Sequence, residues 1–467
     1  MNAGKRLDLV TVCALTAMLG AHGVAQPLLA CQAPQAATAQ NSANEPTSKP
    51  ASNQDAIRLA REAFAMLNEG RHKEFIERCS VQMGAALTEA QSMQLRAMLA
   101  MRLGAFQNEI SAEATTKGTY ESVMLQQKYF KGIAKLEIVI DSNQKVAGLW
   151  IRDLQSTTAA ELPPYAKPDS YADEDVLVIT GKFELPGTLT LPKGTDKAPA
   201  VVLVHGSGPH DRDETIVDNK PFRDLAVGLA SRGIAVLRYE KRTHKYAAEI
   251  KATEIGLDEE TSDDALSAVS LLRGRAEVDP RRIFVLGHSL GGMAAPFIAQ
   301  RDPAIAGIVL LAGTPRPLLD VVEEQIDYIA KLDDVVSEEE GKQLDELRAT
   351  KAKIRAGDSD ISKDSLLGAP AAYWKKIDAL RPGEVAAKLM CRILVIQAGR
   401  DYQVDGKSFD GWKAALGDRK NVKYRVFEKL SHLMIAGEGK PSPMDYQKKG
   451  FVDIEVLDEI AGWIQKG

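Results

Sequence analysis

The segment Ile283-Phe-Val-Leu-Gly-His-Ser-Leu-Gly-Gly-Met-Ala-Ala295 joins a short apolar run to a run of small residues through a glycine-rich turn. The apolar run predicts a buried strand, and the small residues after it predict a helix that packs closely against neighbouring elements. Gly287 to Gly291 form a G-x-S-x-G pattern at this junction, which is the strand–turn–helix context that a nucleophilic serine requires. Ser289 is therefore the candidate nucleophile.

Apolar strands alternate with helical segments on both sides of this junction, from about residue 176 to the C-terminus. The predicted strands lie at 198–204, 233–237, 283–286, 305–311, 393–397 and 422–427. Strands that are apolar throughout and separated by helices predict an α/β fold, in which a mostly parallel sheet is covered by helices on both faces.

Residues 315–385 break this alternation, because they have an almost entirely helical and highly charged pattern. Ser337 and Glu340 have the spacing of a capping box at the start of one of these helices. Since the segment lies between two strands of the predicted sheet, we predict that it forms a helical cap over the site. The alternative is an additional layer of solvated helices.

A serine hydroxyl is a weak nucleophile near neutral pH, so Ser289 needs a base. Of the seven histidines, His432 lies in a loop after the last predicted strand, as expected for the chain order serine, acid, histidine. Asp401 follows the preceding predicted strand and is the candidate acid that orients the imidazole. Asp405 and Asp410 are neighbouring alternatives, although Asp405 suits the N-cap of the next helix.

An oxyanion hole needs two backbone N–H groups aimed at the reacting carbonyl oxygen. We expect one from Leu290, the residue after the candidate nucleophile. The second is expected from the glycine-rich loop after the strand at 198–204, where Ser207 is the first choice and Gly208 the next. His205, in the same loop, is expected to form hydrogen bonds with the loop backbone.

Three further segments carry a family resemblance: His205–Glu214, Lys220–Ala226 and Arg238–Arg242. With the G-x-S-x-G junction, they resemble a subgroup of bacterial carboxylesterases, also described as serine aminopeptidase-like or dienelactone-hydrolase-like proteins. Residues 176–467 as a whole resemble the α/β-hydrolase superfamily, which implies the α/β-hydrolase fold. The charged residues of Asp211–Glu214 and Arg238–Arg242 are expected to form ion pairs that shape the rim of the pocket.

The resemblance implies hydrolysis of a small-molecule carboxylic ester through a covalent acyl-enzyme, with no cofactor and no metal. It carries the triad over onto Ser289, Asp401 and His432, which follow the order of the family. Two alternatives stay open: a peptidase or amidase that uses the same triad, and a catalytically inactive surface-binding protein that has kept the fold.

Residues 1–30 have the pattern of a signal peptide, because a short basic segment precedes an apolar run that is too short to span a bilayer. Leu28–Cys31 resembles a bacterial lipobox, in which Cys31 is lipidated; simple secretion is the alternative. Residues 31–54 are rich in small and polar residues and predict a disordered linker. We therefore expect export to the periplasm, the exterior, or a lipid-anchored place at the cell envelope.

Residues 55–155 predict a small α+β domain, with helices first and a meander of strands after them. Their order and length resemble small NTF2-like domains of the DUF3887 type. A proline-rich, polar connector is predicted at 156–175, and the hydrolase-like part extends from 176 to 467.

The composition excludes several other classes of function. The chain has 467 residues and a net charge of −5, so it lacks the basic surplus typical of nucleic-acid-binding proteins. No segment after the signal peptide has the apolar length of a membrane span, so the only expected membrane contact is the lipid anchor. Cys79 and Cys391 make neither a disulfide framework nor a zinc pattern. They are expected to be buried free thiols, and one disulfide between them is the alternative. The oligomeric state stays open.

Overall fold

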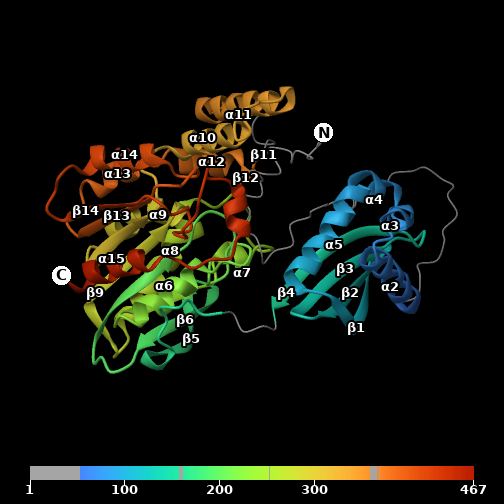
Figure 1. Ribbon diagram of the computed structural model, residues 1–467, viewed down its shortest axis with the longest axis horizontal. Coiled ribbons are helices and arrows are strands. Elements are labelled where there is room, and N and C mark those ends of the chain that lie inside the picture. The colour runs from blue at the N-terminus through green and yellow to red at the C-terminus, as the bar shows by residue number, and fades with distance from the viewer. Residues whose placement is uncertain (1–52, 157–160, 252, 358–364, 368, 467) are drawn as a thin grey trace. The chain divides into compact units, whose positions relative to one another are not determined.

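The computed structural model describes residues 53–156, 161–251, 253–357, 365–367 and 369–466. They form two compact units, one that ends at Glu161 and one that runs from Leu162 onward (Figure 1). The expected signal peptide (1–30), the lipobox cysteine Cys31 and nearly all of the expected linker (31–54) lie outside the described residues.

The first unit consists of four helices followed by an antiparallel sheet. The helices are α2 (Asn53–Glu69), α3 (His72–Arg78), α4 (Val81–Ala86) and α5 (Glu89–Leu103), and the strands are β1 (Phe106–Lys117), β2 (Tyr120–Tyr129), β3 (Gly132–Ile140) and β4 (Val146–Ser156). The strands pair in sequence order, β1-β2-β3-β4. Helix α2 buries Ala60, Phe64 and Leu67, which are spaced three or four residues apart and share one core with the sheet. The small α+β domain is thus confirmed.

The second unit is built on an eight-stranded sheet of order β14-β13-β10-β9-β7-β8-β6-β5. Its strands are β5 (Tyr171–Thr180), β6 (Phe183–Pro192), β7 (Ala198–Val204), β8 (Ala235–Tyr239), β9 (Val278–His288), β10 (Gly307–Leu311), β13 (Arg392–Ala398) and β14 (Val422–Phe427). The six strands from β14 to β8 run parallel, whereas β6 and β5 are antiparallel to their neighbours. This sheet confirms the predicted fold class.

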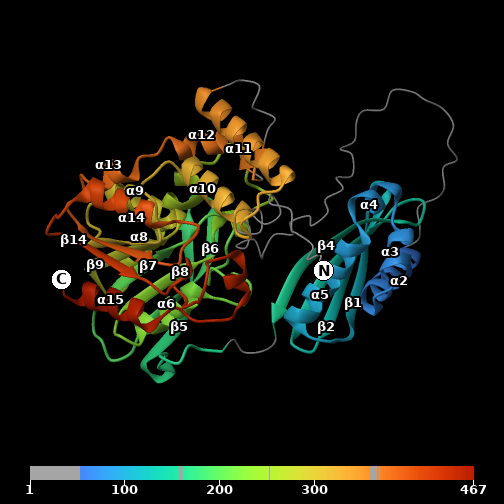
Figure 2. The same ribbon diagram turned by 45° about the horizontal axis from the view of Figure 1, so that its top comes forward.

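Helices cover both faces of this sheet (Figures 1 and 2). One face packs against α6 (Pro221–Ala230) and α15 (Ile454–Gln465), and the other packs against α8 (Asp263–Arg273), α9 (Leu290–Arg301) and α14 (Gly406–Leu416). Strand β7 shows why its sequence is apolar throughout: Val201 and Leu203 belong to one core, and Val202 and Val204 belong to the other. Each such side chain contributes ~1.5–3 kcal/mol through burial.

Two predicted boundaries need correction. Strand β5 begins at Tyr171, inside the segment 156–175 that the sequence analysis gives to the connector. It is an edge strand with an exposed run from Ala172 to Asp175, so its polar composition resembles that of a loop. Helix α2 begins at Asn53, inside the predicted linker 31–54.

The described parts of 315–385 are mostly helical as predicted. They contain α10 (Leu318–Ala330), α11 (Glu338–Ala356), α12 (Ala371–Asp378) and α13 (Pro382–Ala386), and also the short antiparallel strands β11 (Ser365–Leu366) and β12 (Ala369–Pro370). Ser337 and Glu340 form the predicted capping box at the start of α11. Helix α13, however, packs against α9 and α14 and belongs to the layer over the sheet. Among the described residues, the helices of the insertion beyond that layer are therefore α10, α11 and α12.

A widened turn precedes helix α8. Residues Asp258–Ser262 form a π-helical turn, η2, and three consecutive residues of it, Glu260, Thr261 and Ser262, are buried. A regular surface helix does not bury three residues in a row, because they lie about 100° apart around its axis.

Within the described parts of the chain, no helix has both the length and the apolar character needed to cross a bilayer. Cys79 and Cys391 are free thiols, and burial raises the pKa of the Cys79 thiol to about 12. Cys79 is therefore a packing residue rather than a nucleophile near neutral pH.

Candidate active site

Ser289 lies on a strained turn between β9 and α9. Its backbone has φ 54° and ψ −116°, a left-handed conformation that residues with side chains rarely adopt. Two hydrogen bonds hold it there: the Ser289 N–H donates to the carbonyl oxygen of Leu311 (2.9 Å), and its own carbonyl oxygen accepts from Met293 (3.1 Å). Such strain persists only where the surrounding structure enforces it, which is common at reactive residues.

The glycines around Ser289 are required because backbone segments touch there. A Cβ atom on Gly287 would lie 2.0 Å from the carbonyl oxygen of Gly291, and one on Gly291 would lie 2.1 Å from that of Val204. A Cβ atom on Gly292 would lie 2.9 Å from Cα of Gly313. The motif therefore packs the start of α9 directly against β7 and the end of β10.

Asp401 and His432 come together as the sequence analysis predicts. His432 Nδ1 lies 2.6 Å from Asp401 Oδ2, and both residues are buried. The other carboxylate oxygen of Asp401 accepts from the N–H groups of Gln403 (2.8 Å) and Val404 (2.9 Å). Since Nδ1 donates to the carboxylate, the tautomer leaves Nε2 of His432 as the nitrogen that can accept a proton.

Three loops converge at Ser289. The ring of His288, the residue before it, lies 4.7 Å from the ring of His432. A Cβ atom on Gly206 would lie 3.3 Å from Cβ of Ser289, so the glycine-rich loop after β7 passes directly beside the candidate nucleophile. Asp405, the alternative acid, instead caps α14 by accepting from the N–H of Lys407.

The loop after β7 turns its carbonyl groups away from the site. Lys241 Nζ donates to the carbonyl oxygens of Gly206 (2.7 Å) and Gly208 (2.9 Å), and His210 Nε2 lies 2.7 Å from that of Ser207. Among the described residues, no acceptor pairs with the N–H groups of Ser207, Gly208 or Leu290. The oxyanion role expected for these three N–H groups stays a prediction.

His205 has the structural role that the sequence analysis expects. Its Nε2 lies 3.0 Å from the carbonyl oxygen of Asp211, and the side chain is almost fully buried. Burial lowers the pKa of His205 to about 3, so the ring is neutral near neutral pH. Its contact with Asp211 connects the two ends of the loop.

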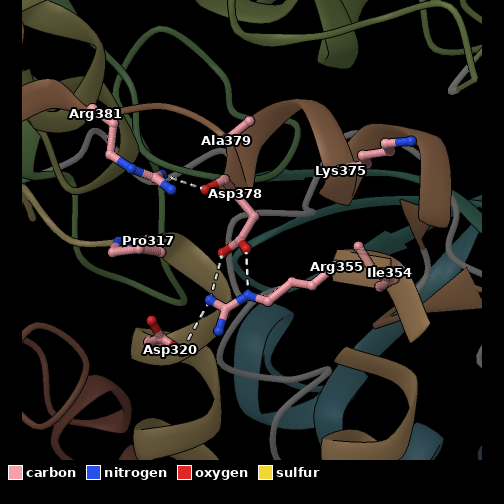
Figure 3. Close-up of a pocket in the computed structure, with 8 residues that line it drawn as sticks. All are labelled: Pro317, Asp320, Ile354, Arg355, Lys375, Asp378, Ala379 and Arg381. Carbon is pink, nitrogen blue, oxygen red and sulfur yellow. Dashed lines mark hydrogen bonds and ion pairs between the residues drawn. The ribbon is translucent and has the colours of Figure 1, made fainter. Parts of the chain in front are cut away.

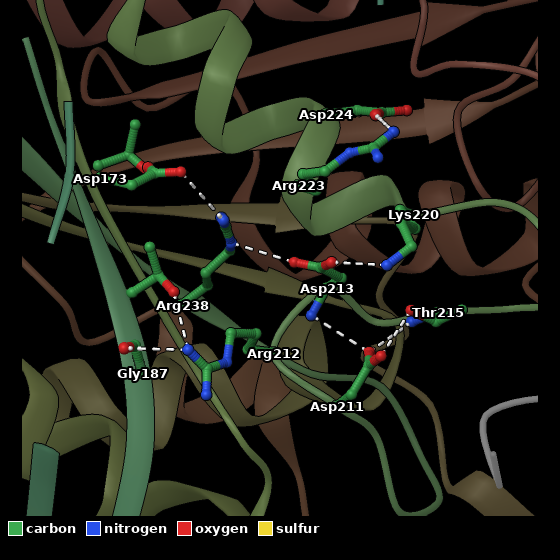
Figure 4. Close-up of polar contacts among 12 residues, drawn as sticks. Asp173, Gly187, Asp211, Arg212, Asp213, Thr215, Lys220, Arg223, Asp224 and Arg238 are labelled. Atoms are coloured by element: carbon green, nitrogen blue, oxygen red, sulfur yellow. Dashed lines mark hydrogen bonds and ion pairs between the residues drawn. The ribbon is translucent and has the colours of Figure 1, made fainter. Parts of the chain in front are cut away.

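The expected ion pairs of the acidic loop are present for Asp213, which contacts Lys220 (2.9 Å) and Arg238 (3.2 Å) (Figure 4). The expectation of a rim position is wrong for Glu214 and Lys241. Both side chains are almost fully buried and form hydrogen bonds with Gly206. Sequence reasoning missed these two residues, because nothing local distinguishes an inward-facing charge from a surface charge.

The helical insertion touches the loop of Asp401 and the π-helical turn η2, whose Glu260 forms an ion pair with Lys241 (2.6 Å). From α10, Gln325 donates to the carbonyl oxygen of Gln403 (2.8 Å), and Tyr328 stacks on Tyr402 beside it. From α12, the hydroxyl of Tyr373 donates to Glu260 Oε2 (2.7 Å). The insertion therefore contacts the loop that carries Asp401 and the carboxylate that pairs with Lys241, as a cap would.

A cavity of about 460 Å³ lies within the insertion rather than at Ser289 (Figure 3). Arg355 crosses it and pairs with Asp378 (2.8 Å) and Asp320 (3.0 Å). Arg381 donates to the carbonyl oxygen of Asp378 from the opposite side. Because these charges satisfy one another, the cavity marks a junction between cap helices and not the reaction centre.

The sequence is similar to those of known proteins. Residues 201–440 match the Alpha/beta hydrolase family, and residues 60–149 match the family described as "Protein of unknown function (DUF3887)". Esterase EstD of Thermotoga maritima is 40% identical over 409 residues, which cover 87% of this chain and 95% of that protein. The thiohydrolase apmlB of Arthrinium phaeospermum is 29% identical over 96 residues, 21% of this chain and 31% of its own.

Est1E from Butyrivibrio proteoclasticus is similar in structure, with a TM-score of 0.41 and 15% identity over 63% of this chain and 99% of that one. The match to EstD extends over nearly the whole length of both proteins. The match to the family model over 201–440 and the match to EstD confirm the family that the sequence resembles. The chain belongs to the alpha/beta hydrolase family and is a carboxylesterase-like hydrolase.

Proposed function

We propose that the protein hydrolyses small-molecule carboxylic esters through a covalent acyl-enzyme formed on Ser289. The observation that carries this proposal is the 2.6 Å contact between His432 Nδ1 and Asp401 Oδ2, beside a serine held at φ 54°. In this reading His432 is the base, Asp401 orients it, and the N–H groups of Leu290 and Ser207 form the oxyanion hole, with Gly208 as a further donor.

The chemistry proceeds in two halves. Ser289 Oγ attacks the ester carbonyl carbon while its proton passes to His432 Nε2, and the oxyanion donors stabilise the tetrahedral intermediate. The intermediate collapses, the C–O bond of the ester breaks, and the leaving alcohol takes the proton from His432. Water then attacks the acyl-enzyme with the same base, which releases the carboxylic acid and restores Ser289.

The test is the hydrolysis of p-nitrophenyl esters, from acetate to decanoate, by the full-length chain and by Ser289→Ala. We expect Ser289→Ala to remove nearly all turnover, whereas the control Ser270→Ala, at an exposed serine on α8, keeps it. Turnover of amides but not of esters would favour a peptidase or amidase. Absence of both, with no labelling by a fluorophosphonate, would favour an inactive binding protein.

We also propose that the chain is exported and lipidated at Cys31. The support is the composition of 1–30 and the match of Leu28–Cys31 to a lipobox. Palmitate labelling of the expressed chain tests it, with Cys31→Ser beside the parent. Equal labelling of both would contradict lipidation at Cys31, and an unprocessed N-terminus would contradict export.

A further inference from the structure

Glu214 joins two parts of the site through its two carboxylate oxygens. Oε1 accepts a hydrogen bond from the N–H of Gly206 (2.7 Å), and Oε2 forms an ion pair with His288 Nδ1 (2.9 Å). The Glu214 and His288 side chains are 1% and 5% exposed, so water does not screen these contacts.

The same histidine reaches the candidate base. His288 Nε2 lies 3.0 Å from the carbonyl oxygen of His432. A carbonyl oxygen can only accept, so Nε2 carries a proton, while Nδ1 faces a carboxylate. The ring is thus placed to be protonated on both nitrogens, with Glu214 as its counter-ion.

The electrostatics agree with this geometry. Burial alone would raise the pKa of Glu214, but the charge and hydrogen bond of His288, with His210 and His205, lower it to about 2. Burial lowers the pKa of His288, but Glu214 outweighs this and raises it above its ordinary value. Both shifts favour the charged form of the pair over the neutral form.

We infer that Glu214 is a positioning residue, which holds the oxyanion loop directly at Gly206 and, through His288, holds the base in register with Ser289. The inference rests on the proposed function, because it assigns to Glu214 the support of that same site. Glu214 fixes the peptide between His205 and Gly206, which is one peptide before the N–H of Ser207, the proposed oxyanion donor. His288 fixes the backbone of His432. Neither Glu214 nor His288 is required to touch the substrate.

This role predicts a particular kinetic signature. In Glu214→Gln, one amide cannot accept from Gly206 and also neutralise His288, so at least one link is lost. Displacement of the oxyanion loop weakens binding of the transition state more than binding of the ester. We therefore expect kcat to fall by ~10–100-fold while KM changes by less than ~3-fold.

The experiment measures kcat and KM of the full-length protein for one p-nitrophenyl ester, per active site titrated with a fluorophosphonate. The matched control is Asp213→Asn, since Asp213 is a neighbouring, partly exposed carboxylate that pairs with Lys220 and Arg238 instead. We expect this control to keep kcat per titrated site. An equal fall in both variants, or an unchanged kcat in Glu214→Gln, would overturn the inference.

If Glu214→Gln does not fold, two variants of His288 test the inference instead. His288→Gln keeps an N–H near the position of Nε2 and can still donate to the carbonyl of His432, whereas His288→Ala cannot. We expect Gln to restore a large part of the kcat that Ala loses; equal loss in the two variants would overturn the role of the His288 link. Retained turnover in Ser289→Ala would instead show that the proposed function itself is wrong.

Discussion

The ammonium group of Lys241 lies 2.6 Å from Oε1 of Glu260, and both side chains are almost fully buried. The same group donates to the carbonyl oxygens of Gly206 and Gly208, so its three protons have three acceptors. Tyr373 of the cap donates to the other oxygen of Glu260. A single lysine thus connects the loop beside Ser289 to the helical insertion.

Lys241→Met should destabilise the hydrolase unit strongly. It removes one partner of a buried ion pair, leaves the Glu260 charge uncompensated, and releases two carbonyl groups of the oxyanion loop. Breaking such a pair costs ~3–5 kcal/mol, so the melting temperature measured by calorimetry should fall by several degrees. Lys245→Met, at an exposed lysine four residues later, is the control and should melt like the parent. Equal melting of both variants would contradict the buried role of Lys241.

The contact of Gly291 with Val204 predicts that Gly291→Ala does not form a stable hydrolase unit. A Cβ atom 2.1 Å from a carbonyl oxygen forces backbone to move, because no flexible side chain can yield there. Soluble yield and thermal unfolding measure this. Gly406→Ala is the control: Gly406 begins α14 with no atom near its Cβ position, and alanine favours the helix by up to ~1 kcal/mol. A folded, active Gly291→Ala protein would contradict the close contact between Gly291 and Val204.

Asp401→Asn should fold but lose activity. Its amide oxygen can still accept from the N–H groups of Gln403 and Val404, while the charge that orients His432 is lost. We expect kcat to fall by ~10³–10⁴-fold in ester hydrolysis. Asp405→Asn should remain within ~2-fold of the parent, since asparagine caps helices as well as aspartate. A loss of only a few-fold in Asp401→Asn would contradict the assignment of the acid.

Asp224 predicts a pH-dependent stability. Burial raises the pKa of its carboxyl to about 6, although Arg223 and the N–H of Val452 act in the opposite direction (Figure 4). The folded state therefore binds more protons than the unfolded state between pH ~4 and about 6, and stability falls as the pH rises through this window, by ~3 kcal/mol.

Asp224→Asn removes this titration, because the amide stays neutral. The unfolding free energy of Asp224→Asn relative to the parent should therefore increase between pH 4 and pH 7, as measured by denaturant titration of the second unit. Asp458→Asn, at an exposed surface ion pair with Arg232, should show no such pH dependence. A difference between Asp224→Asn and the parent that stays constant with pH would count against the raised pKa.

Local signals in the sequence were sufficient for the six parallel strands of the sheet and for the placement of Ser289, Asp401 and His432 after three of them. Each of these residues follows a short strand, apolar before Ser289 and Asp401 and alternating in β14 before His432, and parallel strands bring their carboxyl ends to one edge. The pattern failed at β5, since an edge strand exposes residues that elsewhere mark a loop. It also failed at Glu214 and Lys241, whose partners, His288 and Glu260, are distant in the chain and are fixed only by tertiary packing.

The widened turn Asp258–Ser262 determines in which direction the side chains before helix α8 point around the helix axis. Its additional residue allows Glu260 to face inward while the helix after it keeps its own buried side. Deletion of one residue there would convert the turn to regular helix and rotate the preceding chain by about 100° about the axis. The Glu260 carboxylate would then swing away from Lys241, so a change of one residue in length, without any loss of charge, would uncouple the cap from the oxyanion loop.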